Sequence, residues 1–412
     1  MKNLLYIDMA YTAQAMRLRQ QGFWEARNSG GYFDRVWALH PIADRVVPGM
    51  QRTEIHRLAA GQIQIEGQSA ACRLPGALAP LNFWLSQRAL FNRLRRYFSK
   101  RGTSLVYATD ALYGGLFAYF MARRLRCPLI IAVWGNWDDQ WNATRTLAMP
   151  RLIPSKRIQD MIIRFVLRRA DRVVVGNRNN FDYVAAHGAY PERISIVSTS
   201  KFLFADHFSD PVKRRSDRSI LAELGLPLDA RPLIHVGRLV PEKLPDQALD
   251  AMISAAHQDR SIYGLFAGDG ALREKMQAHI DAEGLTDRIR LLGALSQSDL
   301  ARLLPHCTVI SPLTGMALIE AGLAGAPIVA YAHEWQTEFI DDGRNGYLVP
   351  PGDTHAMADK AIALLRDAET ANVFSEAIRD HAMKIADRDL IYAAEREMYD
   401  EVIARFSAGA PS

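Results

Sequence analysis

One stretch, His306 to Glu334, constrains the fold more than any other part of the chain. It opens with a short run of β-branched residues, Thr308 to Ile310. Gly315 then precedes an apolar segment with the spacing of a helix, and Pro327 ends that helix before a second buried strand, Ile328 to Tyr331. This order of strand, small-residue turn, helix and strand is typical of an open parallel sheet in an α/β protein.

The small-residue turn of this unit should lie at the carboxyl edge of the sheet, where ligands bind in such folds. The backbone N–H groups of Gly315, Met316 and Ala317 would point from the start of the helix at that ligand, which favours an anion. Glu320, one turn further on, would face the same place and accept hydrogen bonds from ligand hydroxyls. An equally good interpretation is that Glu320 is a surface residue whose carboxylate is stabilised by the helix dipole.

Length, composition and cysteine usage indicate a globular protein with two domains. A chain of 412 residues that is 49% hydrophobic can form two ordinary cores. The widely spaced Cys72, Cys127 and Cys307 form no disulfide framework or thiolate metal pattern, so we expect a reducing cytoplasm. Asp8 interrupts what would be the apolar core of a signal peptide, and the uncharged run Ala111 to Ala122 is too short to span a membrane. We therefore expect a cytoplasmic protein that is soluble or bound to the inner face of the membrane.

The net charge of +5 conceals an asymmetry between the two halves of the chain. Residues 1–210 contain 29 Lys and Arg against 15 Asp and Glu, a balance of +14, and the remainder carries −9. Two amphipathic helices in the first half, Gln87 to Arg101 and Ser155 to Arg169, contain six and five cations. A solvated basic face is the commoner explanation, and contact with an anionic membrane is the more specific one. No nucleic-acid-binding module accompanies this charge, so we do not expect a nucleic-acid partner.

Strands and helices alternate through the first half of the chain. Strands are expected at residues 4–8, 36–39, 105–109, 129–133, 172–175 and 194–197. The polar and aromatic residues that follow two of these strands are candidates for a binding site: Asp110, Tyr113, Trp134, Asn136 and Asp138. Asp138 and Asp139 are adjacent but lack a recognisable set of further ligands, so we predict no metal site there.

A polar segment, residues 210–218, separates the two halves, and the alternation of strands and helices restarts at Pro232. We therefore expect two Rossmann-like domains, residues 1–209 and 219–389. Gly237, Arg238 and Lys243 follow the first strand of the second domain. Two cations beside the start of the Gly315 helix would bind a diphosphate by charge-assisted hydrogen bonds.

Four motifs in the second half occur in order within residues 230–365: V-G-R-L-V-P-E-K, G-D-G (residues 268–270), L-I-E-A-G-L-A-G-A-P-I-V-A and D-D-G-R-N-G-Y-L-V-P-P-G-D (residues 341–353). Together they resemble the donor domain of glycosyltransferase family 4, the retaining enzymes of GT-B fold. The first half of the chain resembles that family only in its alternation of strands and helices.

The resemblance implies an α/β fold of GT-B type, with two Rossmann-like domains facing across a crevice that holds a nucleotide-diphosphate sugar. Arg238, Lys243 and Glu320 would be the catalytic residues of the site. Arg238 and Lys243 would contact the diphosphate, and Glu320 would contact the ribose. The further donor contacts would be Gly237, Gly293, Thr314, Gly315, Met316, Ala317 and Leu318. Residues 1–209 would bind the acceptor, a glycan or lipid-linked glycan, and a C-terminal helix, residues 390–412, would pack back on them. No cofactor or metal ion is expected beside the nucleotide-sugar co-substrate.

Two departures from the family pattern keep alternatives open. The family pairs Glu320 with a carboxylate eight positions earlier, where this chain has Pro312, and Trp134 replaces a common histidine on the acceptor side. The reaction would invert if Asp110, Asp138 or Asp139 acted as a general base. A nucleotide-sugar epimerase of GT-B fold and a catalytically inactive binding subunit are the two other classes of protein that these residues fit.

Overall fold

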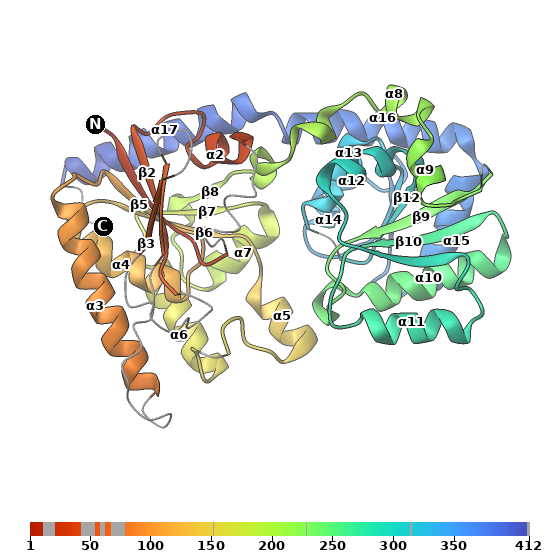
Figure 1. The fold of residues 1–412 in the computed structure, drawn as a ribbon. Coiled ribbons are helices and arrows are strands. Elements are labelled where there is room, and N and C mark those ends of the chain that lie inside the picture. Colours follow the sequence, from red (N-terminus) through yellow and green to blue (C-terminus); the bar gives the residue numbers. More distant parts are fainter. Residues whose placement is uncertain are drawn as a thin grey trace. The chain divides into compact units, whose positions relative to one another are not determined.

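The computed structural model describes residues 1–10, 21–42, 54–57, 62–66, 79–150, 152–227, 229–313 and 315–409. These residues form two compact units, each built around its own sheet (Figure 1). The first unit comprises Met1–Asp139, Thr146–Phe202 and Arg388–Ser412, and the second comprises Gln140–Arg145 and Leu203–Asp387. The predicted fold class, two α/β domains with parallel sheets, is confirmed.

Within the described part of the first unit, eight strands form one sheet in the order β3-β4-β2-β1-β5-β6-β7-β8. Their bounds are β1 (Asn3–Ile7), β2 (Arg35–His40), β3 (Glu54–Arg57), β4 (Gln62–Glu66), β5 (Leu105–Ala108), β6 (Leu129–Val133), β7 (Arg172–Val175) and β8 (Ile194–Ile196). All neighbours are parallel except β3, which pairs antiparallel with β4 at the edge. The strand order reverses between β1 and β5, which makes this the switch point of the first sheet.

Helices cover this sheet with apolar faces. The described helices of this unit are α2 (Gln21–Arg27), α3 (Ala79–Ser99), α4 (Tyr113–Leu125), α6 (Lys156–Leu167), α7 (Arg178–Ala186) and α17 (Arg388–Ser407). A further helix, α5 (Trp137–Thr144), begins in this unit, and its residues from Gln140 on belong to the second. In α3, Leu90, Leu94 and Phe98 recur every four residues and are buried, so one stripe of the helix faces the sheet. Burial of each such side chain stabilises the fold by about 1.5–3 kcal/mol.

The described part of the second unit contains a parallel sheet of six strands in the order β11-β10-β9-β12-β13-β14. Their bounds are β9 (Arg231–Val236), β10 (Ile262–Ala267), β11 (Ile289–Gly293), β12 (Thr308–Ser311), β13 (Ile328–Tyr331) and β14 (Tyr347–Val349). The helices are α8 (Pro211–Ser216), α9 (Ser219–Glu223), α10 (Pro245–Gln258), α11 (Arg273–Ala282), α12 (Gln297–Leu303), α13 (Ala317–Leu323), α14 (Gln336–Phe339), α15 (Thr354–Arg366) and α16 (Ala368–Ile385). Here the strand order reverses between β9 and β12.

The C-terminal helix α17 belongs to the first unit, where a buried polar cluster anchors it. The Glu395 carboxylate accepts hydrogen bonds from Lys201 Nζ and from Ser29 Oγ, the latter at 2.6 Å. Arg396 donates to the carbonyl of Gly30 at 2.8 Å. A helix formed by the last part of the chain thus completes the unit formed by the first part.

The boundary between the units differs from the sequence interpretation, which placed it after residue 209. Phe202 packs against Phe23 in the first unit, whereas Leu203 lies in the core of the second. The predicted linker, residues 210–218, contains the helix α8. Its N-terminus is capped by Asp210, whose side chain accepts from Val212 N at 2.9 Å, and Pro211 takes the first helical position. The polar segment that we interpreted as a linker therefore begins with a capped helix.

No helix in the described ranges is both long and apolar enough to cross a membrane.

Candidate active site

The candidate donor site lies at the switch point of the second sheet. Because β9 and β12 are parallel neighbours, the loop that begins at Gly237 and the turn that begins at Pro312 leave the sheet at the same edge. The short 3₁₀ helix η5 (Pro241–Lys243) follows Gly237 and Arg238, and α13 follows the turn. The residues that the sequence placed on the diphosphate and on the ribose therefore come from adjacent strands.

The G-D-G motif is required by close packing of two loops. A Cβ atom on Gly268 would lie 1.8 Å from the carbonyl oxygen of Gly237, and one on Gly270 would lie 2.4 Å from that of Leu239. Leu239 N also donates to Asp269 O at 3.0 Å. The loop after β10 thus supports the loop that carries Arg238.

Arg238 and Lys243 bring two positive charges to this edge. Arg238 is exposed and donates to Glu242 Oε1 at 3.3 Å. Burial lowers the pKa of Lys243; the negative charges of Glu334 and Glu242 raise it, and the positive charge of Arg238 lowers it further. Two cations that destabilise one another gain most from a multivalent anion such as a diphosphate.

His235, which sequence reasoning missed, joins β9 to β12 beneath these cations. Its Nδ1 lies 3.2 Å from the carbonyl oxygen of Ile310, and its ring is fully buried. Burial, together with the nearby charge of Lys243, lowers the pKa of His235 to about 4, so the ring is neutral at physiological pH. His235 lies within the continuous buried run of β9, and the sequence contained no sign that it does more than fill the core.

The turn after β12 is braced by Gln336, another residue that the sequence did not single out. Its fully buried side chain donates to Pro312 O at 3.0 Å and to Tyr331 O at 3.1 Å. Gly315, Met316, Ala317 and Leu318 follow this turn into the start of α13. Thr314 lies outside the described residues. The turn itself accepts from the next N–H groups, since Leu318 N donates to Gly315 O at 3.1 Å and Ile319 N to Met316 O at 2.9 Å. The predicted contact of this helix start with an anion stays a prediction.

Glu320 lies in the first turn of α13 and is largely buried, with 8% of its surface exposed. Its Oε1 atom lies 3.8 Å from Nε2 of His207, which belongs to the 3₁₀ helix η4 (Ala205–Phe208). Burial raises the pKa of Glu320, and His207 lowers it. The interpretation of Glu320 as a solvated surface residue is therefore wrong.

Gly293, which the family resemblance placed at the donor, ends β11, two strands away from β9. Its carbonyl accepts from Gly268 N at 2.8 Å, and its φ of 74° suits a glycine. The structure thus gives Gly293 a place in the support of the G-D-G loop.

On the first sheet, the switch point is flanked by two buried carboxylates. Asp8 follows β1 and pairs with Arg27, whose Nη2 lies 2.6 Å from Asp8 Oδ2. Asp110 follows β5, and its Oδ1 accepts from Leu112 N at 2.8 Å and Gly114 N at 3.1 Å. Asp8 was missed as a site candidate because we considered it only in relation to a signal peptide.

Asp110 is poised to exchange a proton near neutral pH. Burial raises its pKa to about 6, although the backbone N–H groups at the start of α4 oppose that shift. Its Oδ2 atom is buried and has no hydrogen-bond partner among the described residues. A Cβ atom on Gly114 would lie 2.2 Å from this oxygen, so the glycine makes room for the carboxylate.

The other predicted acceptor-side residues have different environments. Tyr113 donates from its hydroxyl to Gln87 Oε1 at 2.7 Å, which ties α4 to α3. Trp134 is half-buried and packs against the core beneath α17. Asn136 caps α5, since its Oδ1 accepts from Asp138 N at 3.0 Å. Asn136 therefore serves the local fold, whichever ligand binds nearby.

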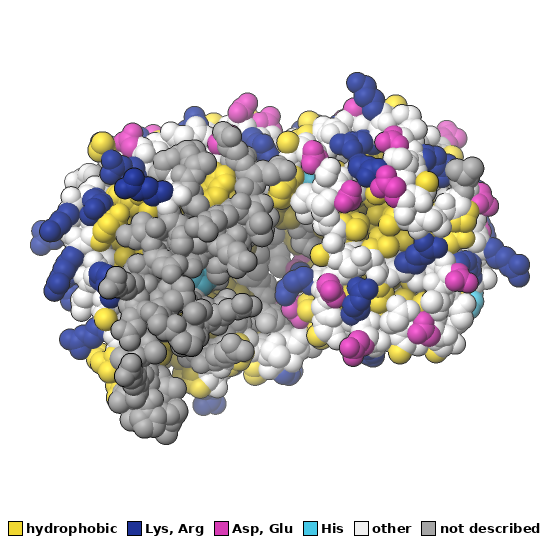
Figure 2. All heavy atoms as spheres, viewed as in Figure 1, with side chains coloured by type: hydrophobic (Ala, Val, Ile, Leu, Met, Phe, Trp, Pro, Cys, Tyr) yellow, Lys and Arg dark blue, Asp and Glu magenta, His cyan; other side chains and the backbone are white. Residues whose placement is uncertain are grey.

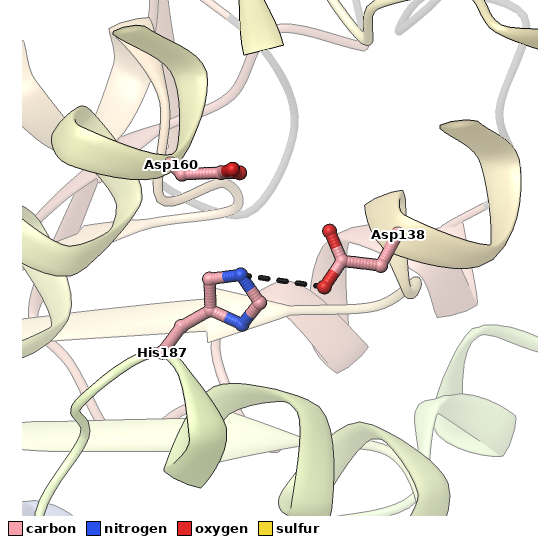
Figure 3. Close-up of side chains that lie close together, drawn as sticks. All are labelled: Asp138, Asp160 and His187. Atoms are coloured by element: carbon pink, nitrogen blue, oxygen red, sulfur yellow. Dashed lines mark ion pairs between the residues drawn. The ribbon is translucent and has the colours of Figure 1, made fainter. Parts of the chain in front are cut away.

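Asp138 belongs to a cluster that unites three helices. In the described ranges, one group of side chains is close enough to hold a metal ion: Asp138, Asp160 and His187. Their potential ligand atoms lie within 4.8 Å of one another, and the side chains are directed toward a common point (Figure 3). His187 Nε2 is 3.4 Å from Asp138 Oδ2. Asp139 is not part of the group. The partners of Asp138 come from α6 and the end of α7, so sequence adjacency gave no sign of them.

A lysine of the chain itself neutralises this cluster. Lys156 Nζ donates to Asp138 Oδ1 at 2.6 Å and also to Asp160. Burial alone would lower the pKa of Lys156, but these two hydrogen bonds raise it above its ordinary value. One of the five cations expected on the outer face of residues 155–169 is therefore turned inward.

Two family models match this chain in succession. Residues 40–199 match the "Glycosyl transferase 4-like domain", and residues 216–381 match "Glycosyl transferases group 1". The chain belongs to the GT-B glycosyltransferases. The second match covers the candidate donor-site residues Arg238, Lys243 and Glu320.

Two relatives of similar sequence have the names of glycosyltransferases. The chain is 26% identical over 295 residues to the alpha-D-kanosaminyltransferase of Streptomyces kanamyceticus, covering 69% of this chain and 72% of that protein. It is 32% identical over 226 residues to the D-inositol 3-phosphate glycosyltransferase of Mycobacterium tuberculosis, covering 53% of this chain. The chain spans 46% of the length of that second relative.

Solved structures show the same fold over nearly the whole chain. HepE of Anabaena, solved with UDP and glucose, superposes with a TM-score of 0.73 at 16% identity, covering 97% of this chain and 100% of that one. The sucrose-phosphate synthase of Thermosynechococcus elongatus gives 0.74 at 16% identity, covering 98% and 100%. The GT-B fold of this glycosyltransferase is therefore established.

Proposed function

We propose that this glycosyltransferase transfers a sugar from a nucleotide-diphosphate sugar to a glycan or lipid-linked glycan acceptor. The observation that carries the proposal is the position of Arg238, Lys243 and Glu320 on the segments that follow two adjacent strands, β9 and β12, at the switch point of the second sheet. The two cations would bind the diphosphate, and Glu320 would accept hydrogen bonds from the ribose hydroxyls. HepE, which shares this fold, was solved with UDP and with UDP-glucose, and this supports a donor of this class.

The charges at this site favour a reaction without a metal ion. Transfer leaves a nucleoside diphosphate, and Arg238, Lys243 and the start of α13 would stabilise the negative charge that develops on it. In a retaining reaction, the leaving phosphate itself takes the proton from the acceptor, so the protein needs no general base. A reaction without a general base fits this chain, because Pro312 replaces the carboxylate that the family has at that position. The Asp138 cluster already contains the ammonium of Lys156, which a metal ion would have to displace.

Nucleotide binding and product analysis test this proposal. UDP, GDP and ADP are titrated into the wild type and into Glu320→Gln by calorimetry, with and without EDTA. We expect one nucleotide to bind the wild type with or without EDTA, and Glu320→Gln to weaken it more than it lowers the turnover of bound donor. Product analysis with the matching nucleotide sugar distinguishes the alternatives, since an epimerase would form a second nucleotide sugar without an acceptor. An inactive binding subunit would bind the nucleotide and form no product.

The acceptor would meet the first unit at an anionic membrane surface. On α3, Arg88, Arg93, Arg96 and Lys100 are exposed, and Figure 2 shows Lys and Arg side chains along the edge where Figure 1 places α3. Trp84, 53% exposed, lies on the same helix one turn before Arg88. Exposed cations beside an exposed aromatic side chain are typical of helices that bind at a lipid interface. A lipid-linked acceptor would be presented at such a surface.

A further inference from the structure

His207 has a buried position that its local sequence does not explain. It lies on η4, which contacts both α12 and α13 in the second unit. Its side chain is fully buried, and its Nε2 atom faces two acceptors, Gln297 Oε1 at 2.8 Å and Glu320 Oε1 at 3.8 Å. A histidine that only filled the core would not need to lie beside the carboxylate proposed to bind the ribose.

The hydrogen bonds of the ring identify its tautomer. Nδ1 of His207 is buried and has no partner in the described part of the chain, so a proton there would be an unsatisfied buried donor. A proton on Nε2 has an acceptor in Gln297, at the start of α12. Of the two tautomers, the one with Nε2–H is therefore favoured; its proton is donated to Gln297, and the same nitrogen lies 3.8 Å from Glu320 Oε1.

We propose that His207 is a positioning residue for Glu320: its hydrogen bond to Gln297 fixes the ring so that the positive Nε2–H edge lies 3.8 Å from the Glu320 carboxylate. This inference rests on the proposed function, in which Glu320 accepts the ribose hydroxyls of the nucleotide. The positive edge of the ring favours the ionised carboxylate in a largely buried place by electrostatic attraction, at a distance too long for a hydrogen bond, so both carboxylate oxygens stay able to accept from the ligand. Burial alone would favour the neutral acid, a poorer acceptor for two hydroxyls.

Two substitutions at His207 separate this role from simple packing. His207→Gln can keep an N–H group near the position of Nε2, whereas His207→Asn is too short to reach Gln297 and Glu320. UDP, GDP and ADP are titrated into each full-length variant by calorimetry. For the nucleotide that binds the wild type most tightly, we expect Kd to rise about tenfold in His207→Asn, because a largely buried carboxylate loses the positive N–H edge beside it. We expect His207→Gln to stay within about threefold of the wild type. Equal losses in the two variants, or no loss in either, would overturn the positioning role.

A second pair of variants keeps the test valid if His207→Asn does not fold. Gln297→Glu replaces the aligning amide with a carboxylate that competes for the N–H group and repels Glu320, and we expect it to raise Kd about tenfold. Ser298→Glu adds the same charge at the next, exposed position of α12, and we expect Kd to stay unchanged. Equal behaviour of these two variants would contradict the role of Gln297.

A double-mutant cycle distinguishes a failure of this inference from a failure of the proposed function. In the Glu320→Gln background, we expect His207→Asn to have no further effect on Kd, because the carboxylate it positions is gone. An undiminished effect there would show that His207 acts independently of Glu320, with nucleotide binding itself intact. If the wild type bound none of the three nucleotides, the proposed function would fail, and the role of His207 with it.

Discussion

Lys156 Nζ lies 2.6 Å from Asp138 Oδ1, so α6 supplies the cation that balances the carboxylate at the start of α5. The same ammonium also donates to Asp160, and His187 Nε2 closes the cluster at 3.4 Å from Asp138 (Figure 3). The loop after β6, on which Trp134 and Asn136 lie, is thus fixed by an ion cluster. The charge of Lys156 is not part of the outer basic face.

This arrangement predicts a loss of stability when Lys156 is neutralised. Lys156→Gln leaves two carboxylates close together without their cation, and we expect the free energy of unfolding to fall by about 1 kcal/mol, because the pairs are partly exposed. Urea denaturation provides the measurement. Arg157→Gln, the same change at the exposed neighbouring position, is the control and should have no effect. Equal stability of the two variants would show that the cluster contributes nothing.

Removal of either donor-site cation should impair catalysis while leaving the fold intact. We expect Arg238→Ala and Lys243→Ala each to lower kcat at least about a hundredfold, since each loses about 3 kcal/mol of stabilisation of the leaving diphosphate. Lys275→Ala removes an exposed cation of the same unit and should keep wild-type turnover. Steady-state kinetics with the nucleotide sugar give the comparison. Near wild-type turnover in Arg238→Ala or Lys243→Ala would refute the diphosphate assignment.

Asp110 should make stability depend on pH in a predictable direction. Its pKa is raised to about 6 in the folded protein, so between about pH 4 and 6 the folded state binds more protons than the unfolded state. Stability therefore falls as pH rises through this window. Relative to Asp110→Asn, which does not titrate, we expect the wild type to lose up to about 3 kcal/mol between pH 4 and 7. Chemical denaturation at several pH values checks this, and a difference that is independent of pH would contradict it.

The G-D-G loop should tolerate no side chain at its first glycine. Gly268 has a φ of 154°, and an added Cβ would lie 1.8 Å from a backbone oxygen that cannot move without the loop of Arg238. We expect Gly268→Ala to lower the free energy of unfolding by about 3 kcal/mol or more. Gly315→Ala, where an added Cβ meets nothing within 4 Å, should change it by less than about 0.5 kcal/mol. Thermal and urea unfolding of both variants decide whether the close packing of the loops is real.

The basic face of α3 should bind anionic lipid in a salt-dependent manner. Each cation near such a surface gains about 1 kcal/mol, so replacing the exposed Arg93, Arg96 and Lys100 and the half-buried Arg95 with Glu should abolish sedimentation with phosphatidylglycerol vesicles. Nucleotide binding in the second unit should persist. The control carries the same charge reversal at four exposed cations of the second unit: Lys213, Arg218, Lys275 and Arg344. Vesicle binding that survives in the α3 variant, or that is absent from the wild type at low salt, would favour a soluble acceptor.

The strands and the donor-side loops were predictable because their signals are local. Apolar runs marked β1, β5, β6, β7, β9 and β12, and the loop from Gly237 to Lys243 follows its strand directly in sequence. The strands β3 and β4 were missed, because Glu54–Arg57 and Gln62–Glu66 are polar on alternate positions and short. Helix α8 was missed because Asp210 and Pro211 have the same residue types in a turn and at a helix start.

The pairing of distant side chains could not be predicted in this way. His207 and Glu320, Lys156 and Asp138, and Lys201 and Glu395 are each brought together by elements whose neighbours are set by the strand order and by the packing of helices onto the sheets. A single sequence shows residue types and their periodicity, and these determine which segments become buried strands or amphipathic helices. It contains no local signal for which polar side chain will share a desolvated space with which other. That choice follows from the packing of the whole unit, because a buried charge is stable only where packing also supplies its partner.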